Sequence, residues 1–163
     1  MHFCESLLIH TQEDREFLSK IIWSDESKFT RDGIFNRRNK HFWADHNPHV
    51  TKEMGFQEKF DLNVFCILKN NKISFFIYED TLNAERYLQI LRTTVTDFLE
   101  NLPLEEYRNS WFQLDGAPAH STQEVSRKLD ELFDDRWFRR LGPWDWPPRS
   151  PDLTPLDFFY GVF

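Results

Sequence analysis

The sequence predicts an α/β fold in which a mixed β-sheet is flanked by helices. β-branched and aromatic residues gather in short runs that are typical of strands, at residues 20–24, 28–35, 62–68 and 73–78. Apolar residues between 88 and 102 recur at helical spacing. A further apolar run at 111–114 is followed by a second amphipathic helical pattern, so strands and helices alternate in the second half.

The first half of the chain carries clear signals for element ends. Residues 3–18 have a weak helical pattern, and the strand after them is expected to end at Asp25. The segment 69–72 contains two Asn residues and predicts a hairpin turn between two strands. Asn83 is a suitable N-cap for the long helix, and Pro103 marks its end.

The second half begins with the short strand that ends at Asp115, where Gly and Pro residues follow. Residues 121–124 have the spacing of a capping box, which predicts a helix from that point. After a proline-rich loop at 142–151, Thr154 is the expected cap of a last helix and Pro155 its first helical residue.

Length and composition restrict the class of protein. The 163 residues suit one domain, and an apolar fraction of 40% is enough for a packed core. No apolar run approaches the ~20 residues that cross a bilayer, and the first ten residues do not resemble a signal peptide, so no membrane partner is expected. Cys4 and Cys66 stand far apart, which argues against a disulfide framework or a zinc site and fits a reducing compartment.

The formal net charge of −7 argues against a dedicated nucleic-acid-binding protein, because such proteins usually carry a basic surface. Two local basic clusters run against this average, although a solvated surface is the simpler explanation of each charge run. The candidate DNA contacts in these clusters are Arg37, Arg38, Lys40, Arg139, Arg140 and Arg149.

Two aspartates follow predicted strands, and this is where the chemistry of the chain is expected. Strand ends in such a sheet gather ligands, so if the two strands are neighbours, the carboxyl groups of Asp25 and Asp115 should lie within about 4–8 Å of each other. Crowded carboxylates repel one another, and Mg²⁺ or Mn²⁺ would relieve that repulsion. Two ions about 4 Å apart can activate an attacking oxygen and stabilise a leaving oxygen. A third carboxylate, Asp157 of the last helix, would complete the site.

Each of these acids has a simpler explanation. Asp25 and Asp115 could be turn formers, and Asp157 stands near a helix start, where any acid is favoured by the helix dipole. Asp152 is most simply a turn residue.

His120 and the tryptophan-rich loop leave two alternatives each. His120 could touch the metal ligands or act as an accessory base, or it could only pack beside the next helix cap. The loop from Trp144 to Trp146 could stack on unpaired bases, or it could cover part of the core.

Three segments in the same order resemble the catalytic region of mariner-type transposases of the DDE/DDD superfamily. Residues 115–120, Asp-Gly-Ala-Pro-Ala-His, resemble the Asp-Asn/Gly-Ala-Pro-x-His box around the second catalytic aspartate. Residues 146–157 resemble the Ser-Pro-Asp-Leu-x-Pro-x-Asp/Glu box, whose last residue is the catalytic acid, here Asp157. Residues 23–29 resemble the segment around the first aspartate.

The resemblance implies a ribonuclease H-like fold, a two-metal site of Mg²⁺ or Mn²⁺ on Asp25, Asp115 and Asp157, and cut-and-paste transposition of DNA. The 41 residues between Asp115 and Asp157 exceed the gap of typical mariner elements. With Asp152 as third ligand the gap would be 36, but the motif and the predicted helix start both favour Asp157. Two other hypotheses are an inactive or domesticated remnant that binds DNA or a partner, and a nuclease acting on RNA–DNA hybrids.

The domain organisation follows from the resemblance. We expect an N-terminal linker or helix at 1–18 and a catalytic domain at 19–163, truncated in its last helix and hence weakly active. The helix-turn-helix domains of the family are not in this sequence. The expected partners are transposon-end and target DNA and, in a full-length protein, a second copy of the chain. The expected location is the nucleus, although no targeting signal is seen.

Overall fold

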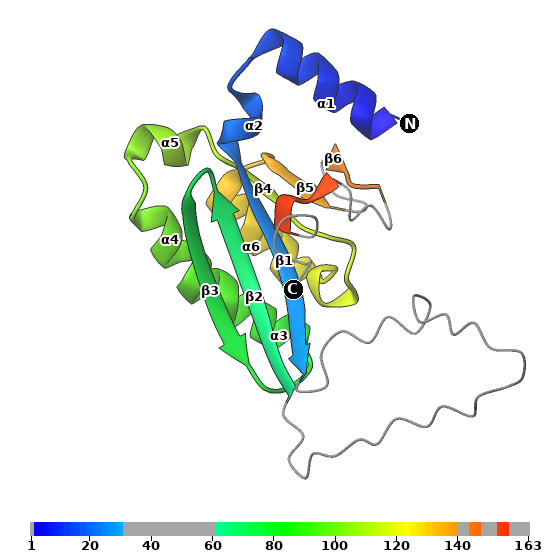
Figure 1. The fold of residues 1–163 in the computed structure, drawn as a ribbon, viewed down its shortest axis with the longest axis vertical. Coiled ribbons are helices and arrows are strands. Elements are labelled where there is room, and N and C mark those ends of the chain that lie inside the picture. Colours follow the sequence, from blue (N-terminus) through cyan, green and yellow to red (C-terminus); the bar gives the residue numbers. More distant parts are fainter. Residues whose placement is uncertain (1, 31–60, 140–143, 148–152, 157–163) are drawn as a thin grey trace, which may run out of the picture.

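The fold is described by a computed structural model for residues 2–30, 61–139, 144–147 and 153–156. Its centre is a six-stranded mixed sheet with helices packed against it, which confirms the predicted fold class (Figure 1). None of the helices in these described ranges is long and apolar enough to cross a membrane.

The sheet has the strand order β3-β2-β1-β4-β5-β6. Its antiparallel half consists of β1 (Ile21–Thr30), β2 (Asp61–Lys69) and β3 (Lys72–Tyr78). Its parallel half continues from β1 through β4 (Trp111–Gln113), β5 (Trp137–Arg139) and β6 (Trp144–Asp145). The last two strands were not predicted, because three and two residues are too few to establish an alternating pattern.

Strand β1 is longer than its composition predicts. We expected it to end at Asp25 and a separate strand to begin at Lys28, but β1 runs through both residues and pairs with β2 up to Thr30. Antiparallel pairing with β2 satisfies the backbone here, so the polar run 24–28 stays extended. Asp25 therefore lies inside a strand and not in a turn.

The β2–β3 hairpin matches the prediction. Asn70 occupies the turn with a φ of 54°, a left-handed conformation that Asn tolerates better than most residues. The weak helical pattern before β1 forms two helices instead of one, α1 (His2–Glu13) and α2 (Phe17–Lys20).

The long predicted helix forms three consecutive helical segments, α3 (Ala84–Ile90), the π-helical η1 (Leu91–Val95) and α4 (Thr96–Glu100). Its predicted cap is confirmed, because the Asn83 side chain accepts a hydrogen bond from the Arg86 backbone N–H at 2.8 Å. A further short helix, α5 (Leu104–Arg108), follows Pro103 and was not predicted.

The segment after β4 contains the short 3₁₀ helix η2 (Pro118–His120) and then α6 (Gln123–Phe133). The capping-box prediction was one residue early, because Thr122 is the cap and accepts from the Val125 N–H at 3.3 Å. Pro155 is helical directly after Thr154, as expected.

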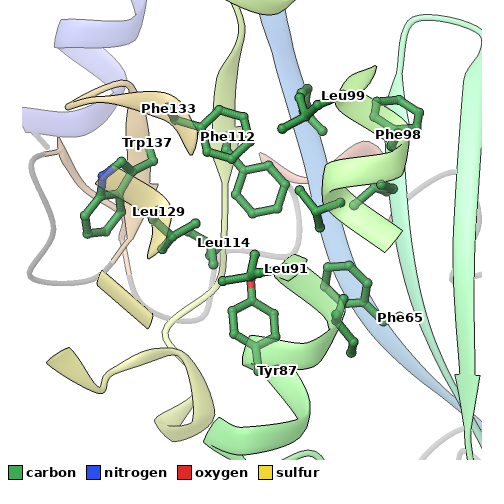
Figure 2. Close-up of a cluster of buried hydrophobic side chains, with 14 of the residues drawn as sticks. Phe65, Tyr87, Leu91, Phe98, Leu99, Phe112, Leu114, Leu129, Phe133 and Trp137 are labelled. Carbon is green, nitrogen blue, oxygen red and sulfur yellow. The ribbon is translucent and has the colours of Figure 1, made fainter. Parts of the chain in front are cut away.

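Two apolar clusters stabilise the sheet. The larger one lies between the sheet and the helices α3, η1, α4 and α6, which stand behind the sheet in Figure 1, and its side chains are drawn in Figure 2. The smaller one contains Phe17, Ile21, Phe138 and Trp146. Trp146 is 4% exposed and Trp144 packs against this cluster, so this loop covers core and does not present both rings for base stacking.

Candidate active site

Two strands bring the predicted catalytic aspartates to matching positions. Strands β1 and β4 are parallel neighbours, and Ile22 pairs with Phe112. Asp25 and Asp115 each stand three residues beyond this pair, so the register aligns them at the same level of the sheet. The predicted approach of these two acids required neighbouring strands, and the topology meets that condition.

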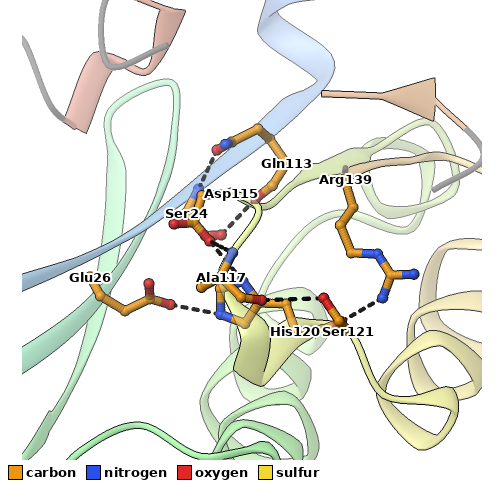
Figure 3. Close-up of polar contacts among 8 residues, drawn as sticks. All are labelled: Ser24, Glu26, Gln113, Asp115, Ala117, His120, Ser121 and Arg139. Atoms are coloured by element: carbon orange, nitrogen blue, oxygen red, sulfur yellow. Dashed lines mark hydrogen bonds and ion pairs between the residues drawn. The ribbon is translucent and has the colours of Figure 1, made fainter. Parts of the chain in front are cut away.

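A buried side-chain bridge continues the contact between the two strands. The Ser24 N–H donates to Gln113 Oε1 at 3.2 Å, and the Ser24 hydroxyl donates to the Gln113 carbonyl at 2.6 Å (Figure 3). Both side chains are buried. Because Ser24 and Gln113 lie between the paired residues and the two aspartates, this bridge holds the strand ends together at the candidate site.

His120 connects the two strands a second time. Its ring lies between two carboxylates, with Nδ1 2.9 Å from Asp115 Oδ1 and Nε2 3.0 Å from Glu26 Oε1. The His120 side chain is 2% exposed, so both carboxylates contact a buried ring. Figure 3 shows the ring approached by Glu26 from β1 and by Asp115 from the end of β4.

The charged forms of His120 and Asp115 stabilise each other. Burial alone would lower the pKa of His120, but the hydrogen bonds to Asp115 and Glu26 outweigh it and raise that pKa to about 9. Burial would raise the pKa of Asp115, but its bonds to His120 and to the Ala117 N–H hold that pKa below its usual value. At neutral pH the ring is therefore an imidazolium and Asp115 an ionised carboxylate.

This cluster should make the metal-free protein lose stability in alkali. A folded-state pKa of about 9 against an ordinary 6.5 means that the contribution of His120 is fully present below pH 6.5 and is lost as the pH rises through 9. The contribution is about 3 kcal/mol. Denaturant unfolding in a chelator at pH 6 and pH 9.5 measures it. His120→Asn should flatten this dependence, and an equal slope in both proteins would contradict the assignment.

Asp25 and Glu26 face opposite sides of the sheet, because neighbouring residues of a strand alternate. Glu26 points to His120, whereas Asp25 pairs with Cys66 on β2. Burial, and then the charge of Asp25, raise the pKa of the Cys66 thiol to about 11.

Glu26 was missed in the sequence as a site residue. It follows a predicted metal ligand directly, and only the extension of β1 past Asp25 shows that it faces the histidine. Its position directly after Asp25 was the available signal in the sequence.

Asp115 fits a divalent cation as an oxygen ligand. Its Oδ1 accepts from the Ala117 N–H at 2.9 Å and contacts His120, whereas no described residue bonds its Oδ2. The side chain is 46% exposed. Ligand atoms of Glu26, Asp115 and His120 lie within 4.8 Å of one another, but both ring nitrogens already face carboxylates. Asp115 Oδ2 is thus the atom of this cluster best placed to reach a metal.

Arg139 was predicted as a DNA contact, but its side chain is buried beside His120. It is 8% exposed, and its Nη1 donates to the His120 carbonyl and, at 3.1 Å, to Ser126 Oγ. This environment argues against a direct DNA contact and makes Arg139 a support of the His120 backbone. The other predicted site residues lie outside the described residues: Arg37, Arg38, Lys40, Arg140, Arg149, Asp152 and Asp157.

Comparisons with known proteins show which family the chain resembles. The family model of the DDE superfamily endonucleases matches residues 20–163. Among curated proteins, the transposable element Tc3 transposase of Caenorhabditis elegans is 27% identical over 146 residues, which cover 88% of this chain.

Two solved structures share the fold. A pre-cleavage Mos1 transpososome superposes with a TM-score of 0.72 at 21% identity, over 99% of this chain and 46% of the other. A Mos1 mariner paired-end complex with Mn superposes with a TM-score of 0.71 at 22% identity, over 99% of this chain and 45% of the other. The chain spans less than half of these proteins, including 41% of the Tc3 transposase.

Proposed function

Because the chain belongs to the DDE superfamily endonuclease family, we propose that it is the catalytic domain of a DNA transposase, which cleaves phosphodiester bonds at transposon ends and joins the freed end to target DNA. The observation that carries the proposal is the register of β1 and β4, which aligns Asp25 with Asp115 on neighbouring strands. The fold shared with the Mos1 structures supports it.

The proposed metal ligands are Asp25, Asp115 and Asp157, with Mg²⁺ or Mn²⁺ as the cation. Asp115 supports this assignment, since it is ionised at neutral pH and keeps Oδ2 for a further bond. A metal pair in such a site supplies electrostatic stabilisation of the attacking and leaving oxygens. The chain itself would contribute carboxylates fixed on a rigid sheet, which hold their geometry without reorganisation during the reaction.

The proposed partner is duplex DNA. The Mos1 relatives are described as a transpososome and as a paired-end complex, and both have the fold of this chain. Pairing of two transposon ends would bring two copies together, so we extend the proposal to a homodimer of the full-length protein. Residues 19–163 would then be the catalytic domain, and the nucleus, where the DNA substrate is found, its place of action.

The test is cleavage by the 163-residue chain with Mn²⁺ in the buffer. We expect slow nicking of duplex DNA that carries transposon ends, and none with a chelator. Cleavage of RNA–DNA hybrids alone would point to a ribonuclease H-like nuclease instead. DNA binding without any cleavage over a range of Mn²⁺ concentrations would contradict the proposal and favour an inactive remnant.

A further inference from the structure

We propose that His120, held by Glu26, is a positioning residue that fixes the Asp115 carboxylate with Oδ1 turned to the protein and Oδ2 left for the metal. This inference rests on the proposed function, since it assumes that Asp115 is a metal ligand. It assigns a role to Glu26 and His120 in addition to the three acids.

The first argument is the geometry at Asp115. Its Oδ1 accepts a hydrogen bond from the Ala117 N–H at 2.9 Å and forms an ion pair with His120 Nδ1 at 2.9 Å, so one hydrogen bond and one ion pair restrain one oxygen. A carboxylate restrained in this way cannot rotate freely, and its second oxygen keeps a fixed direction. Because the side chain is 46% exposed, that second oxygen can be reached by a hydrated cation.

The second argument is the position of Glu26 in β1. Asp25 lies between Ser24 and Glu26 in β1. Both of these neighbours contact the segment that carries Asp115. Ser24 binds the Gln113 carbonyl at 2.6 Å, and Glu26 binds His120 at 3.0 Å. The two bridges therefore clamp the β1 backbone on either side of Asp25, which sets its distance from Asp115.

The third argument is the surroundings of His120, which bury the ring and pack against it. The Tyr87 ring packs on it with 4.1 Å between centroids, and Arg139 donates to its backbone carbonyl. At 2% exposure the ring cannot touch a DNA substrate. Both ring nitrogens face carboxylates, so the ring acts through Asp115 and does not bind a metal or a phosphate itself.

The test measures Mn²⁺ binding to the 163-residue chain by calorimetry, with Mn²⁺ alone as the probe. We expect His120→Ala to weaken the affinity about 10–100-fold, the usual cost of losing a group that orients a metal ligand. His120→Asn should recover most of it, because the Asn amide can still donate to Asp115 but is a poor metal ligand. The exposed Glu131→Gln, a carboxylate outside the site, is the control and should bind as the wild type does.

Variants of Glu26 test the same idea should His120→Ala fail to fold. Glu26→Gln keeps an acceptor for the ring and should stay within about threefold of the wild type, whereas Glu26→Ala should lose about tenfold. Melting temperatures in a chelator identify variants that are folded at the temperature of the measurement.

Asp115→Asn separates the two proposals. If it abolishes Mn²⁺ binding while folded His120→Ala and Glu26→Ala bind normally, the positioning role is overturned and the metal site stands. If Asp115→Asn itself binds Mn²⁺ normally, the metal site fails. If folded His120→Asn binds as weakly as His120→Ala, a polar contact with Asp115 at this position is not the cause, and the inference is overturned.

Discussion

Replacing Asp115 by Asn is expected to slow metal-dependent DNA cleavage about 10²–10³-fold, equivalent to about 3–4 kcal/mol of transition-state stabilisation. The substitution keeps the size of the side chain and removes its charge. The remaining amide oxygen is a weaker ligand for a hard cation, and an amide NH₂ placed at Oδ1 would face the N–H groups of His120 and Ala117. The measurement is the initial rate of duplex nicking over a series of Mn²⁺ concentrations.

The control for this experiment is a second acid that the structure places away from the site. Glu131 is 66% exposed and pairs with Lys128 on its own helix, so Glu131→Gln should leave the rate unchanged. Asp115→Asn also removes a partner of His120, so rates are compared below the melting temperature of each variant. A rate within about threefold of the wild type would show that Asp115 does not hold the catalytic metal.

Features that depend on local sequence signals could be predicted. The hairpin at Asn70 and the cap at Asn83 depend on local chemistry, and both are present. Asp115 after a short apolar strand was predicted for the same reason, since strand β4 and the turn-forming residues after it are local signals.

Features that depend on a neighbouring strand or helix could not be predicted in this way. The polar segment after Trp23 remains a strand only because β2 pairs with it, and this pairing turns Glu26 toward the histidine. Arg139 belongs to a strand of three residues that exists because β4 lies beside it. Its side chain bonds to the backbone of His120, 19 residues away in the sequence, and no local pattern predicts such a contact.

The largest effect on stability is expected from a substitution in the buried core. Phe112 is fully buried in β4 and stacks on Phe133 of α6, with ring centroids 4.8 Å apart and planes 14° from parallel (Figure 2). Phe112→Ala would remove this contact and leave a cavity between sheet and helix. We expect a loss of about 3–5 kcal/mol, measured by urea denaturation in a chelator.

Phe75 of β3 provides the matched control, because it has the same side chain in the same sheet but is 61% exposed. Phe75→Ala should change the free energy of unfolding by less than about 0.5–1 kcal/mol. Equal losses in the two variants would mean that the face between β4 and α6 is not the stabilising core. Because Phe112 is three residues before Asp115 on the same segment, its loss should also loosen the carboxylate. Mn²⁺ affinity should therefore fall in Phe112→Ala at temperatures where it is still folded, and remain unchanged in Phe75→Ala.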